Sequence, residues 1–147
     1  MTDEIEKRWS QIMSRFGEPD TRLVVDLEGI QSDLQDELFG GRPELGRTYD
    51  PESRSLSILL DALDALALLE PDDASYPWDR ALILDVVGRP LDAAHAYVEA
   101  ADRFSRAPAA TGDESDWAAE ARDKAAVCFE AAGSTASAAA VKALAQG

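Results

Sequence analysis

The chain has little cysteine and no long hydrophobic run. Cys128 is the only cysteine among 147 residues, so no disulfide can form within the chain. The longest apolar stretch, Leu56 to Leu69, contains Asp61 and Asp64 and is too short and too charged to span a bilayer. The N-terminal residues MTDEIEKRWSQ lack the apolar run of a secretory signal. These absences lead us to expect a cytoplasmic protein.

Positive charge is also scarce. The chain has 14 lysine and arginine residues against 29 aspartate and glutamate residues, and its formal net charge is −15 at pH 7. Because nucleic acids are bound through cationic side chains that release counterions, we expect neither DNA nor RNA as a partner. An anionic membrane surface would repel the chain for the same reason. A cationic protein surface would be attracted, mainly through a faster association rate; alternatively, the acids serve only solubility.

Residue types that support catalysis or metal binding are few. His95 is the only histidine, and its spacing from Asp92 and Glu99 predicts a surface ion pair on a helix rather than a catalytic pair. Cys128 lies on the apolar side of a predicted helix and is expected to be a buried structural thiol. The acidic run 113–116 lacks the spacing of a calcium-binding loop. We therefore expect no catalytic residue, no metal site and no cofactor.

Apolar residues recur with a period near 3.6 along almost the whole chain, and no segment keeps a period of two. Proline and glycine fall almost only at the junctions between the periodic segments, which favours helices that end there. The pattern predicts an all-α protein of about seven antiparallel helices. Their expected bounds are 3–16, 21–38, 51–69, 77–87, 90–105, 116–132 and 135–145.

The stretch from Ala65 to Phe104 has the form of a helix–turn–helix repeat. A small and a large residue lie one turn apart in one helix, a glycine forms the turn, and small, aromatic and small residues follow in the next helix. These residues are Ala81, Leu84, Gly88, Ala93, Tyr97 and Ala100. The last two predicted helices repeat the register with Ala126, Phe129, Gly133, Ala138 and Ala145. This pattern resembles the tetratricopeptide repeat, a family of stacked helical pairs.

The resemblance covers residues 57–147 and is weak over residues 1–54. The two turn glycines are about 45 residues apart, against a family period of about 34, and we attribute the excess to an insertion near 108–118. The resemblance implies a right-handed stack of helical hairpins, an α–α superhelix. The length of 147 residues indicates a single domain, residues 1–147. An alternative that fits the same residues is a generic antiparallel bundle with alanine-rich helix contacts.

In this family the first helix of each pair lines a concave face that binds other proteins. The resemblance implies a groove that is partly apolar and partly acidic, where an apolar anchor of the partner contacts Trp78 and Leu82 and its lysines or arginines meet the acids. In the alternative interpretation, Trp78 is buried between repeats and the acids form a solvated helix face. The partner-binding residues that the resemblance implies are Trp78, Leu82, Asp85, Val86, Glu120, Asp123, Val127 and Glu130.

The sequence thus predicts a non-enzymatic protein–protein interaction module, an adaptor that presents this groove to a basic, apolar segment of a partner. One alternative is a small acidic protein of the immunity or antitoxin type that neutralises a basic toxin, and another is a structural subunit of a larger assembly. The excess of arginine over lysine and the many alanines are typical of a GC-rich bacterial genome.

A second copy of the chain is a further candidate partner. The apolar stripe of Trp9, Ile12 and Met13 in the first predicted helix is suited to a dimer seam. Arg42, Arg47 and Arg54 are predicted to contact acids on this chain or on a second copy.

Overall fold

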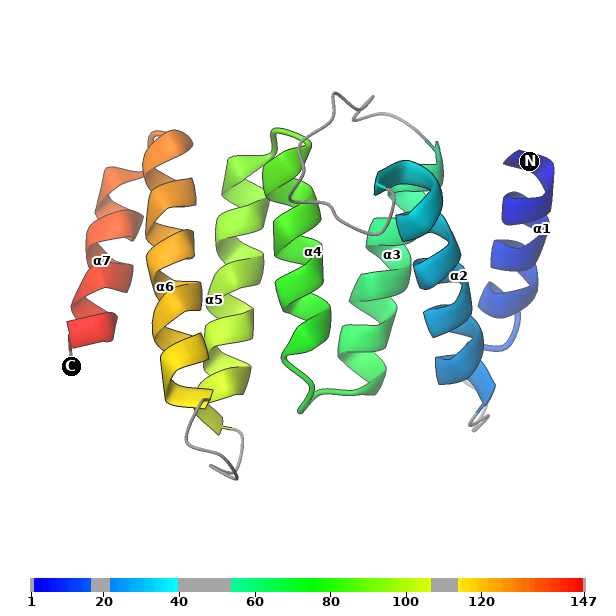
Figure 1. Ribbon diagram of the computed structural model, residues 1–147, viewed down its shortest axis with the longest axis horizontal. Coiled ribbons are helices and arrows are strands. Elements are labelled where there is room, and N and C mark those ends of the chain that lie inside the picture. Colours follow the sequence, from blue (N-terminus) through cyan, green and yellow to red (C-terminus); the bar gives the residue numbers. More distant parts are fainter. Residues whose placement is uncertain (1, 17–21, 40–53, 107–113, 147) are drawn as a thin grey trace. The chain divides into compact units, whose positions relative to one another are not determined.

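A computed structural model describes residues 2–16, 22–39, 54–106 and 114–146 (Figure 1). Over these residues the chain is all-α, with seven helices and no strand, which confirms the predicted fold class. The chain divides into two compact units, Met1–Leu69 and Glu70–Gly147. The first unit holds α1 (Thr2–Met13), α2 (Arg22–Phe39) and α3 (Arg54–Leu69). The second holds α4 (Ser75–Val86), α5 (Pro90–Arg106), α6 (Glu114–Ala131) and α7 (Thr135–Gln146).

In the second unit, each helix packs against the next one along the chain, and consecutive helices run in opposite directions (Figure 1). The helix α5 contacts both α4 and α6. The side chains of the repeat pattern whose burial the structure describes are buried in this unit, and the many alanines among them let neighbouring helices approach closely. The buried members of the pattern are Ala81, Leu84, Ala93, Tyr97, Ala100, Ala126, Phe129 and Ala138.

Helices α4 and α6 end in the same way, at a glycine with positive φ. Gly88 has φ +84° and Gly133 has φ +82°, a region that residues with a Cβ atom rarely occupy. After α4, the Arg89 amide donates a hydrogen bond to the Leu84 carbonyl at 2.8 Å. After α6, the Ser134 amide donates to the Phe129 carbonyl at 2.8 Å. This is the Schellman arrangement, which satisfies carbonyls that the helix leaves without partners. The predicted glycine stops are therefore confirmed at both positions.

The helix α4 begins at Ser75, two residues before the predicted start at Pro77. The carboxylate of Asp73 accepts a hydrogen bond from the Ser75 amide at 2.8 Å. Pro77 then lies in the first turn of α4. Its missing N–H costs no hydrogen bond there, because backbone N–H groups of the first turn have no carbonyl acceptor within the helix. The sequence prediction took the proline as the first helical residue and so placed the start too late.

In the first unit, α2 and α3 pack together and α1 contacts both. Leucines in the middle of the helices, such as Leu27 and Leu63, are buried, whereas Leu69 at the last position of α3 is exposed. At the end of α2, Phe39 is more deeply buried than Leu38. In the stripe of α1 proposed as a dimer seam, Trp9 and Ile12 are buried and only Met13, at 45% exposure, reaches the surface. That seam is consequently not an exposed apolar stripe.

Of the three arginines expected to contact acids, Arg54 does so on this chain. Its Nη2 atom donates to Oε2 of Glu6 at 3.2 Å, which joins the start of α3 to α1. The hydrogen bond with Arg54 holds the pKa of Glu6 below its usual value. Arg42 and Arg47 lie outside the described residues, as does most of the predicted insertion, since α5 ends at Arg106 and α6 begins at Glu114.

Arg103 is a buried charge on α5 that holds the turn before α4. Its Nη1 donates to the carbonyls of Glu70 and Asp73 at 3.1 and 3.0 Å, and its Nη2 pairs with Glu99 at 3.0 Å. The side chain thereby connects α5 to the backbone segment that leads into α4.

We predict that Arg103→Met destabilises the second unit by about 2 kcal/mol, because hydrogen bonds from a charged donor contribute about that much and the carbonyls lose their partner. The matched control is Arg106→Met on the same helix, whose exposed pair with Asp102 should contribute less than about 0.5 kcal/mol. Urea unfolding followed by circular dichroism measures both changes. Equal stability of the two variants would contradict this role for Arg103.

We also predict opposite effects for the same substitution at two glycines. Gly29→Ala within α2 should stabilise its unit by about 0.5–1 kcal/mol, because alanine favours helix and, among described atoms, an added Cβ meets only Arg8 Nη2 at 3.9 Å. Gly88→Ala should destabilise by about 1 kcal/mol, because its φ is positive. Thermal melts of the two variants and the parent chain measure whether each substitution raises or lowers the melting temperature. A change in the same direction for both variants would contradict the prediction.

Candidate partner-binding surface

A pocket of about 300 Å³ opens between α4 and α6 in the second unit. We name it the α4–α6 pocket. Four of the eight residues that the sequence analysis assigns to partner binding line it together. Its lining consists of Asp85 from α4 and of Glu120, Asp123, Lys124, Val127 and Cys128 from α6.

The spacing along α6 explains why these residues share a face. Glu120, Asp123 and Val127 are separated by three and four positions, and residues at that spacing are neighbours on a helix surface. Asp85 comes from a different helix, and the packing of α5 against both α4 and α6 brings it to the same pocket. Three carboxylates and one ammonium give the pocket a net negative charge.

Trp78, which was expected to contact an apolar anchor of the partner, packs against other side chains of this chain. It is half-buried against a core cluster of Ala100, Ala101 and Ala121, and its ring makes edge-to-face contacts with three other aromatic rings. The centroid distances are 5.4 Å to Tyr97, 6.1 Å to Phe104 and 5.6 Å to Trp117. Trp78 thus belongs to a packed aromatic cluster, and it still presents one ring face to Lys124, whose Nζ lies 5.9 Å from the centroid.

Trp117 is a surface residue that the sequence analysis did not select. It is 44% exposed and stacks on Phe104 at 6.1 Å between centroids. Its position three residues before Glu120 places it on the same stripe of α6 as the pocket residues, a signal that was present in the sequence. At the other end of this stripe Val127 is 65% exposed.

The remaining predicted residues lie outside the pocket lining. Leu82 and Val86 of α4 are half-buried. Glu130 is exposed and accepts a hydrogen bond from Nζ of Lys142 on α7 at 2.6 Å. An ion pair already present on the chain therefore engages Glu130, in contrast to the carboxylates that line the pocket.

The negative charge of the pocket acts on two buried groups beside it. Cys128 is 3% exposed, and burial together with the charge of Asp85 and a hydrogen bond to it raises the pKa of the thiol to about 11. Burial also raises the pKa of Tyr97, with further contributions from Asp85, Cys128 and Glu120. Both groups stay protonated at neutral pH, so Cys128 is a buried thiol of low reactivity, as the sequence indicates.

His95 does not pair with the acids that its spacing suggests. Asp92 accepts hydrogen bonds from Arg89 and Glu99 pairs with Arg103, while the imidazole lies edge-on to Phe129 at 5.2 Å between centroids. The predicted ion pair of His95 is wrong because Arg89, just before α5, pairs with Asp92 and Arg103, on α5, pairs with Glu99. Within the described part of the chain, no group of three or more His, Cys, Asp or Glu side chains is arranged so that it could hold a metal ion.

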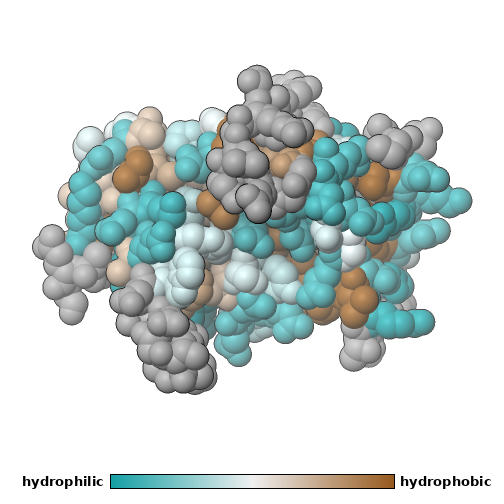
Figure 2. Space-filling view, viewed as in Figure 1, coloured by the Kyte–Doolittle hydropathy of each residue, from teal (hydrophilic) through white to brown (hydrophobic). Residues whose placement is uncertain are grey.

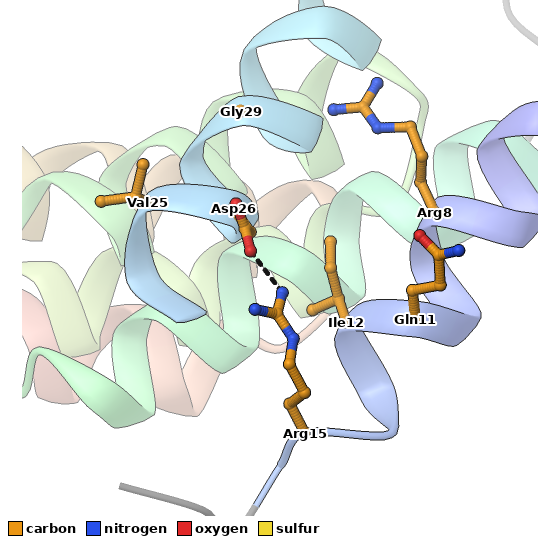
Figure 3. A pocket seen from close by; sticks show the side chains of 7 residues that line it. All are labelled: Arg8, Gln11, Ile12, Arg15, Val25, Asp26 and Gly29. Carbon is orange, nitrogen blue, oxygen red and sulfur yellow. Dashed lines mark hydrogen bonds and ion pairs between the residues drawn. The ribbon is translucent and has the colours of Figure 1, made fainter. Parts of the chain in front are cut away.

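A second pocket, of about 410 Å³, lies between α1 and α2 in the first unit (Figure 3). Ile12 of α1 lies between Arg8 and Arg15, Arg15 pairs with Asp26, and Gly29 belongs to the ribbon of α2 that faces them. Arg8 pairs with Asp33 at 2.8 Å. This pocket was not predicted from the sequence, although Arg8, Ile12 and Arg15 have helical spacing.

On the face drawn in Figure 2, hydrophilic residues predominate and hydrophobic ones form separate small areas. Among the helices that the structure describes, none is both long enough and apolar enough to cross a membrane. Comparison with models of protein families, with curated proteins and with solved structures finds no match to this chain.

We predict that Cys128 reacts slowly with iodoacetamide in the folded protein, because a rise in pKa from 9.0 to about 11 lowers the thiolate population at pH 8 by about a hundredfold. Asp85→Asn removes a negative charge and a charged acceptor, and should accelerate the alkylation. Asp102→Asn, a carboxylate outside the pocket, is the control. Equal rates for Asp85→Asn and the parent chain between pH 7.5 and 9.5 would rule out this influence of Asp85.

Proposed function

We propose that this chain is a non-enzymatic protein-interaction module that binds a basic, apolar segment of a partner at the α4–α6 pocket. The observation that carries the proposal is the convergence of Asp85, Glu120 and Asp123 from two helices on one concave site. Carboxylates at that site favour cationic side chains of a partner, and their charge increases the rate of encounter.

Apolar side chains are exposed beside the carboxylates, and they would contact apolar side chains of a partner. Trp117 and Val127 are both exposed on the stripe of α6 that lines the pocket. Aromatic side chains at such positions commonly contribute much of the binding energy of an interface. A partner segment that combines an arginine or lysine with apolar neighbours would match both features.

The resemblance to the tetratricopeptide repeat agrees with this location. In that interpretation α4 with α5 and α6 with α7 are two successive helical pairs, and α4 and α6 are the first helices of each pair. The shared Schellman ends of α4 and α6 and the buried repeat residues of α5 and α7 support it. A cytoplasmic location and a role as an adaptor belong to the same proposal.

The test is a pull-down from native lysate with three forms of the chain, at low and high salt. One form carries Glu120→Lys/Asp123→Lys, which reverses two pocket carboxylates without disturbing the packed Trp78. The control carries Asp36→Lys/Glu37→Lys, which makes the same change in net charge at exposed positions of α2. We expect a basic partner that the parent and the control capture, and that the pocket variant binds at least about tenfold more weakly.

Higher salt should weaken the capture, because the carboxylates are exposed to solvent. A partner that all three forms capture equally would show that the pocket is not the binding site. Capture of a single basic toxin in a stoichiometric complex would favour the neutralising function over the adaptor.

A further inference from the structure

A cation of this chain, Lys124, connects the lining of the α4–α6 pocket to the ring of Trp78, which lies outside that lining. Lys124 lines the pocket together with Asp85, Glu120 and Asp123, and its Nζ lies 5.9 Å from the centroid of the Trp78 ring. Within the described part of the chain, Lys124 forms no ion pair shorter than 4.0 Å. The ammonium therefore lies over the indole face, and no single carboxylate fixes it by an ion pair.

An arginine or lysine of a partner protein would be attracted by the same surroundings. A cation within about 6 Å of an indole centroid is attracted to the ring, and nearby carboxylates add to the attraction. The position over Trp78 is thus a cation site that the chain occupies with its own side chain. A long, flexible lysine stem can leave such a position at little cost, because its ammonium is readily hydrated.

We propose that Lys124 is a resident competitor in the α4–α6 pocket, and that an arginine of the partner displaces it from the face of Trp78. The proposal rests on the proposed function and names the group that the pocket recognises. Arginine suits the position better than lysine, because its planar guanidinium stacks on aromatic rings and can pair with a carboxylate through two N–H groups.

One consequence separates a competitor from an ordinary binding residue. If Lys124 competes with the partner, its removal strengthens the binding of a cationic ligand. If Lys124 holds the carboxylates or the aromatic cluster in place, its removal weakens that binding. The variant Lys124→Met keeps an apolar stem over the ring and removes only the charge.

The experiment uses the full chain and the capped peptide acetyl-Leu-Arg-Leu-amide, titrated while the indole N–H signals of Trp78 and Trp117 are followed by NMR. The matched peptide with citrulline in place of arginine has nearly the same shape without the charge. Lys7→Met, at an exposed position of α1, is the control variant that makes the same change in net charge.

We expect Lys124→Met to bind the arginine peptide about two- to fivefold more tightly than the parent chain, the range of an exposed cation–π contact. Lys7→Met should bind as the parent does, and the citrulline peptide should shift neither indole signal in any form. Equal or weaker binding by Lys124→Met would overturn the proposal, as would equal shifts with citrulline.

The outcome is separable from that of the pull-down. If Lys124→Met fails to strengthen the binding of the arginine peptide while reversal of Glu120 and Asp123 still abolishes partner capture, the competitor role is wrong and the proposed function stands. If the arginine peptide binds as expected but capture does not depend on the two acids, the competitor role is supported as a property of the pocket and the proposed function is wrong.

Discussion

The close packing of α5 between α4 and α6 is the contact on which the second unit and its pocket depend. Ala93, Ala100 and Ala101 on α5 are almost completely buried, and their small side chains let the two neighbouring helices approach closely. Because α4 and α6 both pack on α5, Asp85 comes to lie at the same pocket as Asp123, 38 positions further along the chain. Larger residues at the alanine positions would separate the helices and remove the pocket.

The same arrangement sets the electrostatic character of the site. Burial is the main cause of the raised pKa values of Cys128 and Tyr97, and carboxylates that lie beside them on two helices raise both values further. Lys124 offsets part of this charge from within the pocket. A region with an unbalanced negative charge, an indole face and exposed apolar neighbours is suited to a cationic side chain and poorly suited to an anionic one.

Much of the fold followed from local patterns, and the exceptions lie at helix ends. Leu27 and Leu63 belong to the period of 3.6, lie in the middle of their helices and are buried. Leu91 and Leu69 belong to the same period but are exposed, because they are the second residue of α5 and the last residue of α3. A hydrophobic period defines a face of a helix, and it carries no information on how far along that face the neighbouring helix extends.

The helices, their glycine ends and the stripe of acids on α6 follow from the sequence, because each depends on residues within a few positions of one another. The packing of the helices is needed to bring Trp78 among Tyr97, Phe104 and Trp117, and to place the Lys124 ammonium over its ring. It also decided that arginines, and not His95, pair with Asp92 and Glu99. Contacts of these kinds depend on the direction of side chains and on the distance between packed helices, and neither is encoded in the spacing of residue types.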